Sequence, residues 1–103
     1  MAYIIPTEEL ISDPHLQEFF EGVAKLRTAK EVEKVLSDAL TDVELQFLIK
    51  RWRAIKMISQ GVPYRKIAKE LGISTSTITK AAYSYYQERG GWHILLRKLG
   101  YLK

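Results

Sequence analysis

The sequence contains no cysteine and no long apolar run. Without cysteine, the chain cannot form a disulfide or a thiolate zinc site, and this composition is typical of a reducing compartment. The first ten residues lack the charged and then apolar order of a signal peptide. No segment approaches the roughly 20 apolar residues that a membrane span requires. The sequence therefore predicts a cytoplasmic protein without a membrane partner.

The sequence also lacks any recognisable set of catalytic or metal-binding residues. No Ser/His/Asp arrangement, glycine-rich phosphate loop or pair of catalytic carboxylates can be identified. His15 and His93 lie far apart along the chain without a cluster of carboxylates beside them, so no metal site is expected. We therefore predict that the protein is not an enzyme and holds no metal ion.

What the sequence does contain is enough apolar material for a core and an uneven distribution of charge. Hydrophobic residues make up 47% of the 103 residues, which predicts one folded domain over residues 1–103. Residues 1–49 hold 4 Lys/Arg and 10 Asp/Glu, whereas residues 50–103 hold 12 Lys/Arg and 2 Asp/Glu. A segregated basic half is typical of a protein that binds a polyanion, with a solvated basic surface as the alternative.

Helical periodicity dominates the chain, and no stretch alternates apolar and polar residues as a half-buried strand does. The pattern therefore predicts an all-α protein. Capping residues, prolines and glycines mark where helices begin and end. The predicted helix starts are Thr7, Asp13-Pro14, Thr28, Thr41, Pro63, Ser74 and Trp92.

The longest predicted helix, from Thr41 to before Gly61, carries two apolar stripes instead of one. At about 100° per residue, the two stripes lie on nearly opposite sides of the helix. A surface helix of a monomer needs one apolar stripe, so this helix needs cover from both sides. We expect an intertwined homodimer, with a central helix wrapped by its own chain as the alternative. One stripe is Val43, Phe47, Ala54 and Ile58, and the other is Leu45, Leu48, Trp52 and Ile55.

The strongest functional signal is a helix-turn-helix pattern over about residues 64–86. Ile67 and Leu71 lie four residues apart, so they face inward together from the first helix. Gly72 permits the positive φ of a tight turn. Ile78 begins the inward face of the second helix, which Ser74 caps at its start.

The second helix of this pattern keeps short polar and cationic side chains for its outward face. Such side chains can approach base edges and phosphates in a major groove, and free amides at a helix N-terminus suit a phosphate. The alternative is a helical hairpin whose Ser/Thr run is only a polar surface. We predict contacts with double-stranded DNA from Arg65, Lys66 and Lys69 on the first helix and from Ser74, Thr75, Ser76, Thr79 and Lys80 on the second.

Three tyrosines near the end of the second helix are expected to have a packing role and not a DNA-binding role. Tyr83, Tyr85 and Tyr86 are expected to pack in the core or in an interface. A contact between a tyrosine hydroxyl and a phosphate is the less favoured alternative.

Together these residues make the chain similar to the trp repressor superfamily, and in particular to its YerC/YecD-type branch. The matching stretch runs from about Leu40 to Trp92. The resemblance implies about six helices, an intertwined homodimer, and operator binding through two symmetric helix-turn-helix units. The residues that carry it are Leu40-Thr41, Arg51-Trp52-Arg53, Gly61, Tyr64-Arg65-Lys66-Ile67-Ala68, Leu71-Gly72, Ser74-Thr75, Thr77-Ile78-Thr79 and Gly90-Gly91.

The same resemblance implies a pocket for a small corepressor. Thr41 and Arg51 match positions that contact the ligand in the tryptophan-binding members, and Ser84 matches a position near the ligand amine. Lys80 replaces an arginine, which removes a planar surface for an indole ring, and Ala81 replaces a glycine, which narrows the slot. A regulator without a ligand, or with another small ligand, is therefore preferred to tryptophan corepression. No other cofactor is expected.

The sequence thus predicts a sequence-specific DNA-binding transcriptional regulator that acts as a homodimer, as a repressor, and is associated with the nucleoid. The alternative is a helical protein-interaction module. Such a module would use the two apolar stripes and the acidic half, and it would bind DNA no better than any basic protein.

Overall fold

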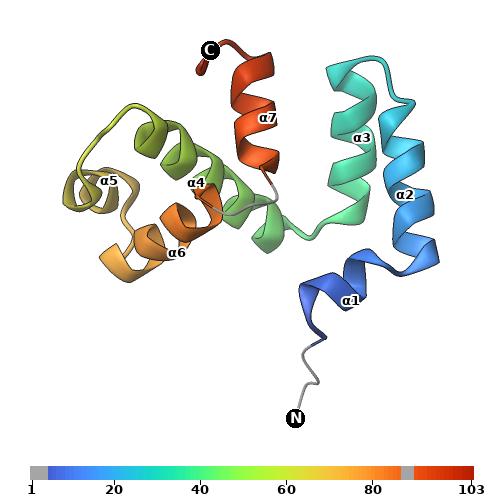
Figure 1. Cartoon of the computed structure of the whole chain (residues 1–103), viewed down its shortest axis with the longest axis horizontal. Coiled ribbons are helices and arrows are strands. Elements are labelled where there is room, and N and C mark those ends of the chain that lie inside the picture. The colour runs from blue at the N-terminus through green and yellow to red at the C-terminus, as the bar shows by residue number, and fades with distance from the viewer. Residues whose placement is uncertain (1–4, 87–89) are drawn as a thin grey trace. The chain divides into compact units, whose positions relative to one another are not determined.

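The computed structural model describes residues 5–86 and 90–103 (Figure 1). Within these ranges the chain forms seven helices and no strand, which confirms the all-α prediction and adds one helix to the six that the resemblance implies. None of the described helices is both long and apolar enough to cross a bilayer. The helices are α1 (Thr7–Ile11), α2 (Pro14–Ala24), α3 (Ala29–Ala39), α4 (Asp42–Ser59), α5 (Tyr64–Leu71), α6 (Thr75–Tyr85) and α7 (Gly91–Lys98).

The helices divide into two compact units. The N-terminal unit, Met1–Thr41, contains α1 to α3, and the C-terminal unit, Asp42–Lys103, contains α4 to α7. The sequence-based assignment of one domain over residues 1–103 stays a prediction.

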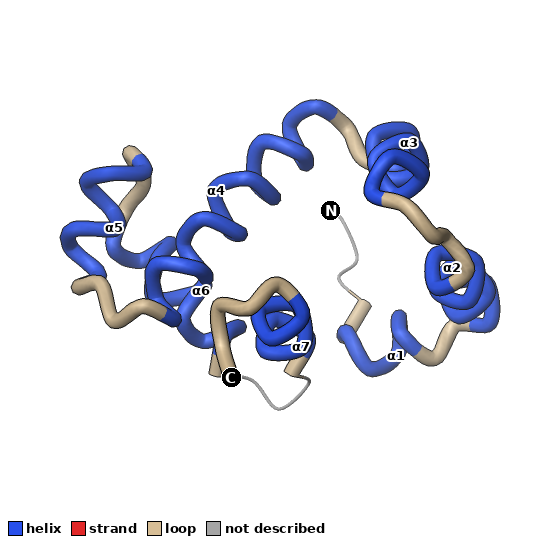
Figure 2. Tube along the Cα trace, turned by 90° about the horizontal axis from the view of Figure 1, so that it is seen from above, coloured by secondary structure: helices blue, strands red, loops and turns tan. Residues whose placement is uncertain are grey.

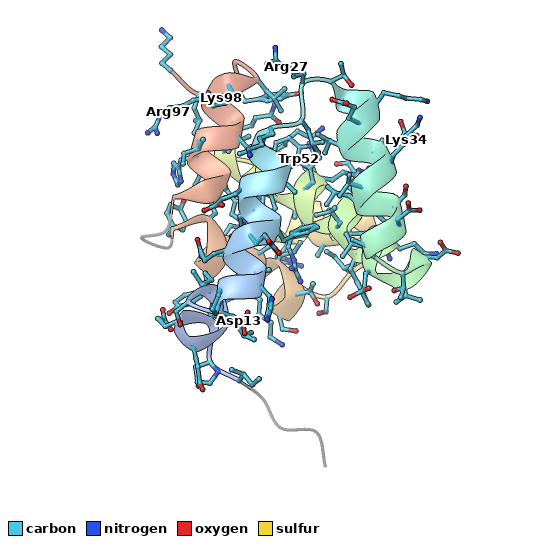
Figure 3. The ribbon with its side chains drawn as sticks, turned by 90° about the vertical axis from the view of Figure 1, so that its right-hand side faces the viewer. Asp13, Arg27, Lys34, Trp52, Arg97 and Lys98 are labelled. Carbon is cyan, nitrogen blue, oxygen red and sulfur yellow. The ribbon has the colours of Figure 1, made fainter. Side chains whose placement is uncertain are left out.

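Predicted caps start two helices of the N-terminal unit, α2 and α3. Asp13 caps α2, where its Oδ1 accepts a hydrogen bond from the amide of His15 at 2.7 Å (Figure 3). Thr28 caps α3 and accepts from the amide of Glu31 at 3.1 Å. The carboxylate of Glu31 accepts from the amide of Arg27 at 2.9 Å, so the return bond goes to the residue before the cap. Local chemistry thus explains where these helices begin.

The core of the protein, as far as the structure describes it, lies in the C-terminal unit. The inner faces of α4, α5 and α6 meet there, and Leu96 of α7 adds a fully buried side chain. Burial of apolar side chains is the main favourable term in folding, so these contacts position the helix-turn-helix. The buried residues are Ala54, Ile55, Ile58, Ile67, Ala68, Leu71, Ile78, Ala81, Ala82, Tyr85 and Leu96.

Helix α7 is held against α4 and α6 by aromatic contacts. The rings of Trp52 and Trp92 stack with centroids 6.0 Å apart, and Tyr101 meets Trp52 edge-on at 6.4 Å. The indole Nε1 of Trp92 donates a hydrogen bond to Ser84 Oγ at 2.8 Å. At the other end of α7, Arg97 occupies the last turn, where a cation interacts favourably with the helix dipole (Figure 3). Helix α7 therefore packs against the helices of the C-terminal unit that include the helix-turn-helix.

The two stripes of α4 are covered over only part of their length. Towards the C-terminal end of the helix, Ala54, Ile55 and Ile58 are buried, as the stripes predict. Towards the N-terminal end, Val43 is 58% exposed and Phe47 is 61% exposed in the single chain. Half of this helix therefore still presents an apolar surface to solvent.

Candidate nucleic-acid interface

Helices α5 and α6 lie side by side and are joined by a short turn (Figure 2). The turn depends on Gly72, whose φ of 67° lies in the left-handed region that glycine tolerates best. The amides of Gly72 and Ile73 both donate to the carbonyl oxygen of Ala68, the second at 3.0 Å, which satisfies the end of α5. Ser74 then caps α6 by accepting from the amide of Thr77 at 3.2 Å. The predicted helix-turn-helix is therefore present, with its second helix starting at Thr75.

The inward faces of the two helices are the ones that the sequence predicts. Ile67 and Ile78 are fully buried, and Leu71 and Ala81 are buried beside them. Ala68 is also buried, because the small side chain allows α6 to pack closely against α5. The opposite faces of both helices are thereby left for solvent or for a ligand.

The outward face of α6 carries the predicted hydroxyl groups. Thr75, Ser76 and Thr79 are all exposed. Their hydroxyls are partly ordered by local bonds: Thr79 Oγ1 donates to the carbonyl oxygen of Thr75 at 3.0 Å, and the Ser74 and Ser76 hydroxyls lie 2.9 Å apart. A hydroxyl held in this way still has a free lone pair, so it remains able to accept a hydrogen bond from a base.

Four predicted cationic side chains surround the same surface. Arg65, Lys66 and Lys69 on α5 and Lys80 on α6 are exposed. In the part of the chain that the structure describes, none of them forms an ion pair. Cations without an acidic partner keep their full attraction for phosphate groups, so the outward side of the helix-turn-helix is a basic surface.

The three tyrosines of α6 do not share one environment. Tyr85 is 8% exposed, so its predicted packing role is confirmed. Its ring stacks on His93 with centroids 4.5 Å apart. Tyr83 and Tyr86 are 72% and 68% exposed, so they are not part of the core of the single chain, and an interface role for them stays a prediction. The helical spacing explains the difference, because Tyr85 continues the buried face of Ile78 and Ala81 whereas Tyr83 and Tyr86 do not.

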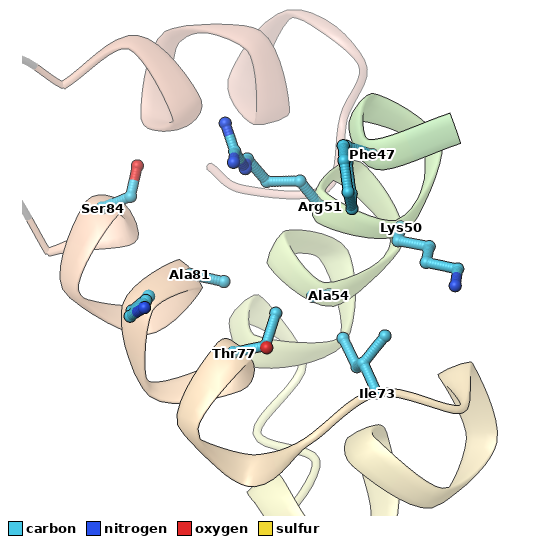
Figure 4. A pocket seen from close by; sticks show the side chains of 9 residues that line it. Phe47, Lys50, Arg51, Ala54, Ile73, Thr77, Ala81 and Ser84 are labelled. Carbon is cyan, nitrogen blue, oxygen red and sulfur yellow. The ribbon is translucent and has the colours of Figure 1, made fainter. Parts of the chain in front are cut away.

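A pocket of about 400 Å³ opens between α4 and α6 in the C-terminal unit (Figure 4). It contains four of the five residues that the resemblance assigns to a ligand pocket: Arg51, Lys80, Ala81 and Ser84. Thr41 ends the N-terminal unit and is not among the lining residues. The remaining lining residues are Phe47, Lys50, Ala54, Ile73 and Thr77.

Three of the five lining residues that the sequence analysis missed lie at helical spacing from those it found. Phe47 and Ala54 stand four residues before and three residues after Arg51 on α4. Thr77 stands four residues before Ala81 on α6. Because residues three and four apart share a helix face, this spacing could have predicted them.

The chemistry of the pocket combines apolar walls with cations. Phe47, Ala54 and Ile73 supply the apolar surface, and Lys50, Arg51 and Lys80 supply positive charge. None of the described lining residues is acidic. Among residues 5–86 and 90–103, no group of three or more His, Asp or Glu side chains could hold a metal ion. The pocket therefore suits a small molecule with an apolar body and an anionic group.

Comparisons with known proteins agree with this arrangement. The family model of the Trp repressor protein matches residues 14–99 of the chain. The uncharacterized protein YerC of Bacillus subtilis (strain 168) is 32% identical over 65 residues, which are 63% of this chain. The match spans 62% of the length of YerC.

Two solved structures have the same fold. The TrpR-like protein from Eubacterium eligens has a TM-score of 0.80 and 24% identity, covering 92% of this chain and 98% of its own. The Trp repressor-like protein from Staphylococcus aureus has a TM-score of 0.78 and 28% identity, covering 92% of this chain and 95% of its own. The chain belongs to the Trp repressor protein family, whose members are non-enzymatic regulators.

Proposed function

We propose that the protein is a dimeric transcriptional regulator that binds specific DNA sites through α5 and α6. The observation that carries the proposal is that α6 has one buried apolar face and one exposed polar face. Its apolar side chains are buried against α5 and α4, while Thr75, Ser76 and Thr79 face solvent at the helix N-terminus. In helix-turn-helix proteins, side chains at this end of the second helix contact base edges, and the first helix crosses the backbone.

The basic surface around these hydroxyls supports DNA as the partner. Arg65, Lys66 and Lys69 lie on the first helix, where contacts with the phosphate backbone fix the position of the protein. Each phosphate that such a side chain neutralises releases counterions, which favours binding at low salt. The cations thus attract DNA of any sequence, and the hydroxyls beside them can distinguish one DNA sequence from another.

The uncovered apolar surface of α4 supports a dimer of this chain. Val43 and Phe47 continue the stripe that is buried further along the helix, yet they are exposed in the single chain. Helix α7 likewise exposes Ile94 and Leu95. A second copy would remove these side chains from water, as interfaces between subunits do. A dimer would also present two copies of α6 to two half-sites.

The test of this function is in vitro selection of duplex DNA by the purified protein. The proposal expects a recurring sequence with two related half-sites, separated by about 34 Å or a multiple of it. Selection that returns no common sequence would contradict it. A stable complex with another protein, combined with DNA binding that shows no sequence preference, would support the alternative of a protein-interaction module.

The pocket supports a second proposal, that a small ligand regulates the same DNA binding. Thr77, Lys80, Ala81 and Ser84 of α6 line it, so a bound ligand would contact the helix that carries the base-reading hydroxyls. The lining favours a ligand with a carboxylate or a similar anionic group. Lys80 and the methyl group of Ala81 make tryptophan a poor fit, because they offer an indole ring neither a planar cation nor the space of a glycine.

Titration calorimetry tests the ligand proposal directly. With L-tryptophan, we expect little heat from the native chain and more heat from the double variant Lys80→Arg with Ala81→Gly. The matched control is Lys34→Arg, which makes the same change of cation in the N-terminal unit. Strong binding of tryptophan by the native chain would show that tryptophan is the ligand, whereas equal, weak heats for all three proteins would contradict the assigned roles of Lys80 and Ala81.

A further inference from the structure

We infer that Tyr83 is an additional DNA-contacting residue, whose hydroxyl donates a hydrogen bond to a phosphate at the edge of each half-site. The inference rests on the proposed DNA-binding function. Tyr83 is 72% exposed, more than any other large apolar or aromatic side chain that the structure describes. In the described part of the chain its hydroxyl has no hydrogen-bond partner and its ring has no aromatic contact.

The register of α6 places Tyr83 on the surface that carries the predicted DNA contacts. At about 100° per residue, Tyr83 lies within about 20° of Ser76 and about 40° of Thr79 around the helix axis. Lys80 lies about 60° away on the other side. The buried residues Ile78 and Ala81 occupy the opposite face. Tyr83 therefore lies near the middle of the outward face and not at its margin.

The position along the helix decides what Tyr83 can contact. It lies seven residues beyond Ser76, which corresponds to about 10 Å along the axis. The N-terminal end of a recognition helix enters the major groove, so residues further along it approach the wall of the groove, which is the sugar–phosphate backbone. A long side chain with a terminal hydroxyl suits that wall, and tyrosine is among the residues that bind phosphate oxygens.

The neighbouring tyrosine has a different position. Tyr86 is also exposed, but it is the C-cap of α6, and its ring meets that of Tyr85 edge-on with centroids 4.9 Å apart. It lies about 80° from Ser76 around the axis. A central register and a ring without an aromatic contact therefore distinguish Tyr83 from Tyr86.

The variant Tyr83→Phe tests the inference, because it removes the hydroxyl and keeps the ring. A hydrogen bond to a charged phosphate is worth about 1.5–3 kcal/mol, so affinity for the selected DNA site should fall about tenfold or more. Phenol and benzene rings are both neutral, so the slope of log affinity against log salt should stay as in the native chain. Selection with the variant should return the same DNA sequence, because a phosphate contact carries no base information.

The control is Tyr101→Phe, which removes the same hydroxyl from a ring that packs on Trp52 outside the helix-turn-helix. Its affinity should match that of the native chain, and thermal unfolding should confirm that both variants remain folded. If the native chain selects a DNA site but Tyr83→Phe binds it unchanged, or selects a different sequence, the phosphate contact is wrong and the proposed function stands. If the native chain selects no site, the proposed function fails, and Tyr83 fails with it.

Discussion

The N-terminal and C-terminal units of the chain are built on the same capping chemistry but differ in what covers their helices. All eleven buried hydrophobic residues that the structure describes lie in the C-terminal unit. In α1, α2 and α3 no residue is buried, although α2 exposes Phe19 and Phe20. Short helices without tertiary packing are marginal in water, so caps alone cannot hold the N-terminal unit. The proposed dimer would supply such packing.

The two units also differ in charge. Up to Thr41 the chain has 4 Lys/Arg and 8 Asp/Glu, whereas from Asp42 onwards it has 12 Lys/Arg and 4 Asp/Glu. The unit with the core is thus the basic unit with the helix-turn-helix, and the unit without a core is acidic. The comparison teaches that the helices that form the core also carry the surface proposed to bind DNA, whereas the N-terminal unit would gain its cover from the proposed dimer. The following predictions would break or sharpen this contrast.

The largest effect is expected from a cavity in the core of the C-terminal unit. Ile67→Ala removes buried methyl groups from α5 and should lower the free energy of unfolding by about 2–5 kcal/mol. Ile67→Val should cost only about 0.5–1.5 kcal/mol. Chemical denaturation measures both values. Equal stability of the native chain and Ile67→Ala would contradict the assignment of this side chain to the core.

The next effect concerns the exposed part of α4. Val43→Asp would bury an unpaired carboxylate in the proposed dimer interface at a cost of about 2 kcal/mol or more for each copy, so it should shift the protein towards monomers. Gln60→Asp introduces the same charge at an exposed polar position just beyond the other end of α4 and should leave association unchanged. Sedimentation velocity over a range of concentrations distinguishes them. A native chain that is monomeric at every concentration would refute the dimer.

A smaller effect compares the helix caps of the two units. Thr28→Ala and Ser74→Ala each remove a side-chain oxygen that accepts from a helix amide, which should cost about 1 kcal/mol of stability. Hydrogen exchange should show faster exchange in α3 for the first variant and in α6 for the second. Only Ser74→Ala should weaken DNA binding, because α6 carries the proposed contacts. Equal loss of DNA affinity in both variants would contradict this division.

The smallest effect comes from removing one cation from each of the two units. Lys69→Ala should weaken DNA binding for all sequences alike and reduce the slope of log affinity against log salt by about one. Lys34→Ala removes an exposed cation from the N-terminal unit and should leave that slope unchanged. Fluorescence anisotropy with a labelled duplex at several salt concentrations measures both slopes. If Lys34→Ala changed the slope more than Lys69→Ala does, the N-terminal unit and not the C-terminal unit would contact DNA.

The sequence predicts the helix starts well because their causes are local. Asp13, Thr28 and Ser74 cap helices where expected, and Gly72 forms the predicted turn. The inward face of the helix-turn-helix also follows from spacing alone.

What the sequence could not predict depends on which surfaces are covered. Periodicity shows that α4 has two apolar stripes, but it cannot show that the apolar residues near the N-terminal end of the helix, such as Val43, are left exposed. The same limit explains Tyr83: residue type suggests packing, whereas exposure depends on what α6 meets in three dimensions. The pocket was predicted in part. The resemblance placed Arg51 of α4 together with Lys80, Ala81 and Ser84 of α6, whereas sequence spacing alone cannot bring residues of different helices together.

The most direct test is a comparison of affinities for the selected DNA site and for a scrambled duplex of the same length. The proposed function predicts that the native chain binds its site at least about a thousandfold more tightly than the scrambled duplex, and that both affinities fall steeply between about 50 and 200 mM salt. Equal affinities for the two duplexes at every salt concentration would contradict the claim that α6 reads DNA sequence.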